Sequence, residues 1–308
     1  MGTQTEYDKP AILGGSQAQL PDGRPYVVSG DIKPLLAGWA AKSGFTLPSD
    51  AFFDDLRTEF SGYMGNIFPR FEFVGEEELT EGTRSLVSDR LPVVSLDRVY
   101  YTSPYTLDMA RRVNPDGRDA GLGRRAGSPP LLRQIRSLQE QGLGDVALFD
   151  DVVFSGAFIE RLGRCLKRAG TMVGTVYCGI SIGEGKGRLQ GLGYDVKSVK
   201  DFSDVIDEVC ERDFYPGVPL SGRLIDPDTN TGAPYILPFG NPEEWASIPP
   251  QHSARFSQFC IDQTVTLFKE IERSSRIPVT CADIGRRVPF LPNDSTRYVD
   301  ALRRTSVL

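Results

Sequence analysis

The sequence predicts an α/β protein with a twisted, mostly parallel sheet, helices on both faces, an N-terminal elaboration and a helical C-terminal extension. Between residues 92 and 200, apolar runs typical of strands alternate with helical patterns of about 10–15 residues, which favours a parallel sheet. The chain has 308 residues, of which 40% are hydrophobic, enough to bury a large core. Residues 253–274 form one long amphipathic pattern, which predicts the C-terminal helix.

The first ninety residues combine short strands with amphipathic helices, after an irregular Gly-, Gln- and Pro-rich stretch over residues 1–25. The helices are predicted from apolar residues at spacings of three and four, such as Phe52, Leu56 and Phe60, and Ser49 or Asp50 can cap that helix. The expected elements are a strand over 26–29, helices over 34–43 and 51–63, a strand over 70–74 and a helix over 79–91.

The middle of the chain carries the strand–helix alternation. Its Gly-rich segment GEGKGRLQGLG is interpreted as a flexible connection between a strand and a helix. The expected elements are strands over 92–101, 146–149, 171–182 and 195–199, helices over 131–141 and 157–169, a Gly/Arg/Pro loop over 114–130, and a helix or turn over 202–211.

The last third differs in composition. Residues 226–250 are rich in Pro, Gly and Asn, with one strand-like run over 235–238, and the long helix follows. We therefore predict an N-terminal elaboration over residues 1–90, which can include the first core strand, a core over 91–225, and a hood segment with a helical extension over 226–308.

Composition excludes several function classes. The net charge of -6 argues against general electrostatic binding of nucleic acid. No apolar run is long enough to span a membrane. Five widely spaced cysteines without a CxxC pair indicate reduced thiols, so a cytoplasmic location is expected. His252 is the only histidine, which excludes sites within one chain that need two imidazoles.

The most informative segment is VALFDDVVFSGAF, residues 146–158. An apolar strand leads into Asp150 and Asp151, and a turn with Ser155 and Gly156 precedes a helix. Ligands of open α/β sheets bind at the carboxyl ends of strands, and backbone amides at a helix N-terminus suit a phosphate. Because two carboxylates would repel that phosphate, they suit the hydroxyls of an attached sugar. The pattern therefore indicates a ribose 5-phosphate site.

This segment resembles the signature of the type I phosphoribosyltransferases, which bind 5-phosphoribosyl 1-pyrophosphate (PRPP). The resemblance implies the family's fold, ribose hydroxyls on Asp150 and Asp151, and Mg²⁺ at the same two acids. It also implies a 5-phosphate cradle formed by Val152, Val153, Phe154, Ser155, Gly156 and Ala157. Two positions depart from the family pattern. Phe154 stands where relatives carry Thr or a proton-accepting Asp, and Phe158 replaces a Thr of the cradle.

The Gly- and Arg-rich loop over 114–130 lies where the family has a mobile loop that closes on the pyrophosphate. Arg118, Arg124 and Arg125 are its available cations, and Arg124 and Arg125 are the expected catalytic ones, because arginine meets pyrophosphate with paired hydrogen bonds. A solvated basic loop is the alternative. The family's second pyrophosphate loop has two candidate positions, Gly75–Glu81, which is acidic, and Ser29–Lys33.

Further residues are assigned to the substrate. Phe214 and Tyr215 are expected to stack on a flat nucleobase, or else to pack in the core. Arg98 is expected to reach the site from a neighbouring strand end, and Trp245 either belongs to a hood or packs in the core. No residue stands out as a general base.

The resemblance implies transfer of ribose 5-phosphate from PRPP to a nitrogen of a nucleobase-like acceptor, with release of pyrophosphate. The alternatives are a PRPP- or nucleotide-sensing regulatory protein of the same fold without turnover, and an enzyme acting on a ribosyl phosphate in a dedicated biosynthetic pathway. The expected partners are PRPP and a nucleobase-like small molecule, with no nucleic acid and no membrane; a homodimer is left open.

Overall fold

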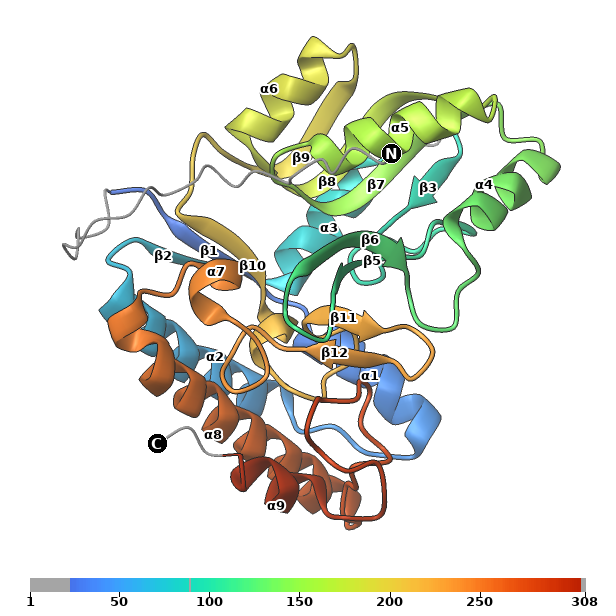
Figure 1. Cartoon of the computed structure of the whole chain (residues 1–308). Coiled ribbons are helices and arrows are strands. Elements are labelled where there is room, and N and C mark those ends of the chain that lie inside the picture. Colours follow the sequence, from blue (N-terminus) through green and yellow to red (C-terminus); the bar gives the residue numbers. More distant parts are fainter. Residues whose placement is uncertain (1–22, 89, 306–308) are drawn as a thin grey trace.

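The computed structural model describes residues 23–88 and 90–305, and within them the strands form three sheets (Figure 1). The predicted irregular stretch over residues 1–25 therefore lies almost entirely outside the described residues. The largest sheet has five parallel strands in the order β4-β3-β7-β8-β9. Their bounds are Tyr105–Thr106, Val93–Ser95, Asp145–Val153, Met172–Ile182 and Asp195–Phe202.

Helices cover both faces of the five-stranded sheet, which confirms the predicted fold class. On one face α4 (Leu131–Glu140), α5 (Ala157–Arg168) and α6 (Gly183–Gly191) contribute apolar residues to a buried cluster with Leu148 of β7. On the other face α3 (Glu76–Leu86) contributes Leu79 to a cluster with Phe149. Neighbouring residues of β7 thus enter opposite clusters, as the pleat of a strand requires.

A three-stranded parallel sheet lies beside the larger one. Its order is β10-β1-β2, with bounds Asp207–Cys210, Tyr26–Ser29 and Phe71–Val74. Its core contains residues of α1 (Ile32–Ser43), α2 (Asp50–Ile67), α7 (Pro242–Ala246), α8 (Pro250–Ser275) and α9 (Tyr298–Arg303). The long helices α2 and α8 run along each other in Figure 1 and are joined by a hydrogen bond from Gln263 to Glu59. The first and last thirds of the chain thus share one core.

The third sheet contains the segment predicted as a mobile loop, and that prediction is wrong in its conformation. Residues 119–124 form β6, which pairs antiparallel with β5 (Met109–Val113). The hairpin joins β11 (Arg223–Asp226) and β12 (Thr231–Ala233) in the order β12-β11-β5-β6. The segment becomes a strand because it pairs with β5, which in turn pairs with β11, and the local Gly- and Arg-rich composition does not reveal these contacts.

Most other predicted elements are confirmed with shifted ends, and four are not. The Gly-rich segment predicted as a flexible connection is the helix α6, and the segment predicted as a helix or turn contains β10. The strand predicted over 92–101 is only three residues long, and residues 235–238 form no strand. The division into domains at residues 90 and 225 stays a prediction, although β10 of the expected core pairs with β1 of the N-terminal segment.

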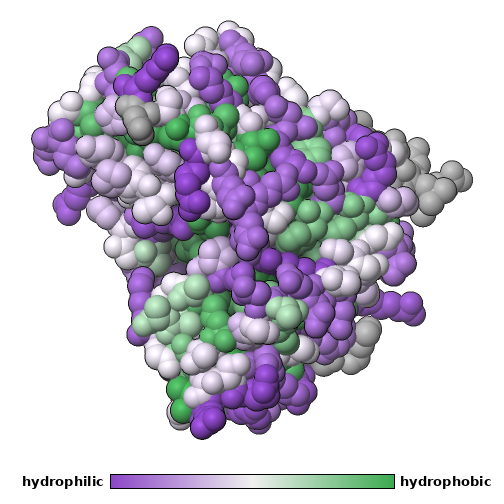
Figure 2. Space-filling view, turned by 180° about the vertical axis from the view of Figure 1, so that it is seen from behind, coloured by the Kyte–Doolittle hydropathy of each residue, from purple (hydrophilic) through white to green (hydrophobic). Residues whose placement is uncertain are grey.

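The surface, the helices and the cysteines each bear on the predictions from composition. On the face seen in Figure 2, patches of hydrophobic residues are interrupted by hydrophilic ones. Among the described residues, none of the helices combines the length and the apolar character needed to cross a bilayer. All five cysteines have free thiols.

Candidate functional site

The acid pair Asp150–Asp151 lies near the carboxyl end of β7, where the order of the sheet reverses. β3 pairs with β7 only as far as Phe149, whereas β8 pairs with β7 as far as Val153. The strand therefore extends four residues beyond its predicted carboxyl end, and the acids lie on the part of β7 that does not pair with β3. In the sheet, β4 lies on one side of β3, and the later strands β7, β8 and β9 follow on the other side. The gap between the carboxyl ends of β3 and β7 is therefore the topological switch point, where open α/β sheets bind ligands.

A tight turn follows the acids. Val152 and Val153 end β7, Phe154 and Ser155 bend the chain, and Gly156 has a φ of 71° before α5 begins at Ala157. The Ser155 hydroxyl accepts a hydrogen bond from the Ala157 amide at 3.4 Å. The predicted order of strand, acids, turn and helix is confirmed.

The turn is packed by backbone rather than by the two phenylalanines. Phe154 and Phe158 lie against the apolar clusters on opposite faces of the sheet. A Cβ on Gly185 would lie 2.2 Å from the carbonyl oxygen of Phe154, and one on Gly156 would lie 2.9 Å from the carbonyl oxygen of Gly185. The first turn of α6 therefore fixes the turn that follows β7.

Arg212 joins the acid pair to the three-stranded sheet. Its guanidinium donates to the Asp151 carboxylate, Nη2 to Oδ2, at 3.3 Å and also pairs with Asp31, which is fully buried. Cys210, at the end of β10, lies 3.6 Å from the same Asp151 oxygen through its Sγ. The carboxyl ends of β7 and β10 therefore meet at Asp151.

The two acids titrate in opposite directions. Burial and the neighbouring charge of Asp151 raise the pKa of Asp150. Burial also opposes ionisation of Asp151, but Arg212 and Arg125 outweigh it and hold the pKa of Asp151 below its usual range. Two carboxyl groups this close titrate as a pair, in which Asp151 ionises more readily than Asp150.

The predicted arginines are mostly engaged elsewhere. Arg124 pairs with Asp228 and donates to the Ser128 carbonyl at 3.1 Å, and Arg98 pairs with Asp108. Arg125 donates to the backbone carbonyls of Met109 at 2.7 Å and Leu96 at 2.9 Å. Of the two expected catalytic arginines, only Arg125 acts electrostatically on the acid pair.

Arg111 of β5 is an exposed arginine that the sequence did not single out. Burial by the surrounding chain lowers its pKa, but Tyr235, Asp207, Asp213 and Asp151 outweigh this effect and raise it. The charge of Arg111 therefore interacts with that of Asp151.

The expected stacking of a nucleobase on Phe214 or Tyr215 is wrong. Both side chains are fully buried, and both rings pack near Phe60 in the core shared by the first and last thirds of the chain. Neither offers a free face to a ligand. Trp245 is buried as well, with the Arg223 guanidinium 4.7 Å above its ring, which fits the core alternative.

Both candidate pyrophosphate loops lie close to Asp151. Asp31, within Ser29–Lys33, shares Arg212 with Asp151, and an added Cβ on Gly179 would contact both Leu79, within Gly75–Glu81, and the carbonyl oxygen of Asp151. Lys33 pairs with Asp50 at 3.1 Å, and the three glutamates at the start of α3 would repel an anion. Neither segment has the chemistry of a pyrophosphate cradle.

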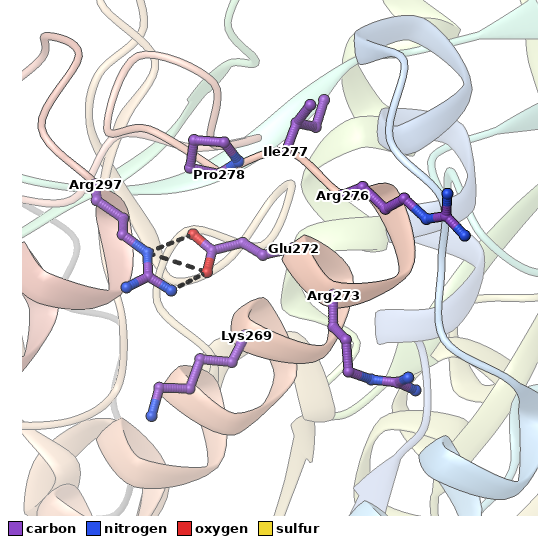
Figure 3. A pocket seen from close by; sticks show the side chains of 7 residues that line it. All are labelled: Lys269, Glu272, Arg273, Arg276, Ile277, Pro278 and Arg297. Atoms are coloured by element: carbon purple, nitrogen blue, oxygen red, sulfur yellow. Dashed lines mark hydrogen bonds and ion pairs between the residues drawn. The ribbon is translucent and has the colours of Figure 1, made fainter.

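A cavity of about 370 Å³ lies away from the acid pair, between the end of α8 and Arg297. Figure 3 shows Arg297 paired with Glu272, while Lys269, Arg273 and Arg276 point in different directions. The cations do not converge on one point, and none of the predicted site residues lines this cavity.

Sequence reasoning missed three groups that the structure brings to the acids: Asp97, Glu208 and Arg212. Asp97 follows β3 and raises the pKa of Asp150, and Glu208 lies on β10. The only local signals for β10 were two β-branched residues, Ile206 directly before the strand and Val209 within it. The missing information was that β10 pairs with β1.

The acid pair suits an Mg²⁺ site in which the protein supplies only one or two of the ligands. Among the described residues, no group of three or more potential ligand side chains is arranged to hold a metal. Mg²⁺ commonly takes one or two carboxylates and completes its shell with water and substrate phosphates. Asp150 and Asp151 could provide those carboxylates.

Comparisons with known proteins give a limited result. No protein-family model matches the chain, and no curated protein matches it. A solved orotate phosphoribosyltransferase from Aeropyrum pernix is 19% identical over 41% of this chain and 71% of its own, with a TM-score of 0.28. An adenine phosphoribosyltransferase from Thermoanaerobacter pseudethanolicus is 14% identical over 41% of this chain and 79% of its own, with a TM-score of 0.26. At such TM-scores the likeness carries no argument about this chain's activity.

Proposed function

We propose that the chain is a type I phosphoribosyltransferase, which transfers ribose 5-phosphate from PRPP to a nitrogen of a nucleobase-like acceptor and releases pyrophosphate. One observation carries the proposal. Asp150 and Asp151 lie at the switch point of a parallel sheet, directly before a glycine turn and the N-terminus of α5. This arrangement suits a vicinal diol at the acids and a phosphate at the turn.

The electrostatics of the pair support a neutral, polar ligand group such as a diol. Both carboxyl groups can accept hydrogen bonds from hydroxyls, and Arg212 and Arg125 favour the ionised form of Asp151 by lowering its pKa. The same negative charge favours the positive charge that develops at the anomeric carbon when the bond to pyrophosphate breaks. The pair would therefore both bind the sugar and stabilise the transition state.

The cations for the leaving group would come from the hairpin side of the gap. Arg125 and Arg111 both act electrostatically on Asp151, and Arg111 is exposed. Mg²⁺ held by Asp150 and Asp151 would neutralise charge on the departing pyrophosphate. In the reaction the anomeric C–O bond breaks, the anomeric C–N bond forms, and the ring nitrogen gives up its proton.

Isothermal titration with PRPP and Mg²⁺ tests the site. The wild-type chain should bind, and Asp151→Asn should lose binding while keeping its circular dichroism spectrum. Asp145→Asn is the matched control, because Asp145 is the exposed first residue of the same strand. Normal binding by Asp151→Asn would refute the site.

Pyrophosphate release separates an enzyme from a sensor. Release in the presence of one acceptor out of a panel of nucleobases supports the transferase, and binding without release in any condition supports the regulatory alternative. The acceptor, the cytoplasmic location and the homodimer stay predictions.

A further inference from the structure

The proposed transfer requires a group that takes the proton from the incoming nitrogen, and most acids near Asp151 are already engaged. Asp97 accepts three backbone N–H bonds, from Val99, Tyr100 and Tyr101. Asp213 accepts the Gly222 amide at 2.7 Å.

Two further buried acids are held by arginines. Asp31 pairs with Arg212, and Glu211, which is fully buried, pairs with Arg57 at 3.0 Å. Glu208 of β10 differs from these acids, because the described residues place neither a backbone N–H nor an arginine in hydrogen bond with its carboxyl.

From this geometry we propose that Glu208 is the proton acceptor of the transfer, an inference that rests on the proposed function. Glu208 and Cys210 are two residues apart on β10, so their side chains lie on the same face of the strand, about 7 Å apart along it. The Cys210 Sγ lies 3.6 Å from Asp151. Glu208 therefore lies on the face of β10 that carries Cys210, and its carboxyl is close enough to Asp151 to sense its charge.

The Glu208 carboxyl is held in place and still has an oxygen to offer. The Ser29 hydroxyl donates to its Oε1 at 2.8 Å, and the described residues supply no hydrogen bond to its Oε2. The side chain is half-buried, so it can reach both protein and ligand. Its neighbour Asp207 points the other way, where it accepts from the Ser247 hydroxyl at 2.7 Å.

The charges around Glu208 suit a base. Burial raises its pKa to about 8, with further increases from Asp151 and Asp207, while the Ser29 hydrogen bond and Arg111 lower it. Tyr26 and Cys210 are the other titratable groups that face it. A base with a pKa near the working pH is the most effective in proton transfer.

The proton balance can be followed without knowing the acceptor, because water can take the place of the ring nitrogen. The anomeric C–O bond to pyrophosphate breaks, the water oxygen bonds to that carbon, and one water proton moves to Glu208. The products are ribose 5-phosphate and pyrophosphate.

The test measures pyrophosphate release from PRPP by the full chain between pH 6 and 10. We expect the wild-type rate to rise with pH through about 8, as Glu208 ionises. Glu208→Gln should lower the rate at pH 9 by about 100-fold or more and remove the rise, because a general base contributes about 10²–10⁴-fold. Glu208→Asp should restore part of the rate and the rise.

The control is Asp207→Asn, on the adjacent residue and the opposite face, which should keep the rise in rate. PRPP binding by titration should be the same for the wild type and Glu208→Gln. An unchanged pH profile in Glu208→Gln would overturn the role of Glu208 alone. Binding without any release by the wild type would overturn the transferase activity and, with it, the role of Glu208. Failure of the wild type to bind PRPP would overturn the proposed function as well.

Discussion

Substitution of Gly156 by alanine tests whether the turn after the acid pair is as tightly fixed as the structure indicates. Gly156 has a φ of 71°, a backbone conformation that is unfavourable for residues with a Cβ, and an added Cβ would meet the Gly185 carbonyl at 2.9 Å and Leu189 at 3.1 Å. Gly142 has a φ of 77° with nothing within 4 Å of an added Cβ. The two glycines therefore differ in steric room but not in backbone conformation.

The magnitudes follow from this difference. An alanine in the left-handed region costs about 1–2 kcal/mol, so Gly142→Ala should lower the free energy of unfolding by about that amount. Gly156→Ala should lose a further ~1–3 kcal/mol, because overpacking a close contact costs about that much. We expect a total of about 2–5 kcal/mol for Gly156→Ala.

Urea unfolding followed by circular dichroism measures both variants, and an unchanged m-value identifies a change in stability. Gly156→Ala should also weaken PRPP binding, because the turn must shift away from α6. Equal losses for Gly156→Ala and Gly142→Ala would refute the packing of the turn against Gly185.

Two further predictions concern the charges around the acids. Arg212→Met should lower the free energy of unfolding by about 3–5 kcal/mol in urea unfolding, because it leaves Asp31 and Asp151 without their partner. The control Arg273→Met, at an exposed arginine, should have a much smaller effect, and similar losses in the two variants would contradict the bridging role of Arg212. The pKa of Glu208 is raised in the folded state to about 8, so its contribution to stability is present below its unfolded pKa of about 4.3 and is lost as the pH rises through about 8. Urea unfolding between pH 5 and 8 should therefore show the wild type losing stability relative to Glu208→Gln, by at most about 1.4 kcal/mol per pH unit, and a constant difference would contradict the raised pKa.

The part of the fold that the sequence predicted is the part with strong local patterns. The helices α2 and α8 have apolar residues at regular helical spacing, and β7 begins with a run of apolar residues that can only be buried. The acid pair and its turn could be predicted because all their residues are neighbours in the chain.

The helix α6 could not be predicted, because its glycines disfavour a helix in isolation. Packing decides there: an added Cβ would lie 2.5 Å from the Ser203 carbonyl at Gly183 and 2.2 Å from the Phe154 carbonyl at Gly185. Two of the glycines that suggested a flexible connection are therefore required by close backbone contacts, Gly183 with Ser203 and Gly185 with the turn after β7.

The charged groups around the acids could not be predicted for a different reason. Glu208 and Arg212 are about sixty residues from Asp151 in the chain, and they reach it because β10 pairs with β1 at the edge of a second sheet. Phe214 and Tyr215 were assigned to a ligand from their place in the chain, but their packing around Phe60 depends on helices far away in the sequence.

The most direct test of the account is a crystal structure of the chain with PRPP and Mg²⁺. The account predicts the ribose 2′- and 3′-hydroxyls within hydrogen-bond distance of Asp150 and Asp151, with the 5-phosphate at the amides of residues 154–157. PRPP bound elsewhere, or an orientation with the diol turned away from the two acids, would contradict it.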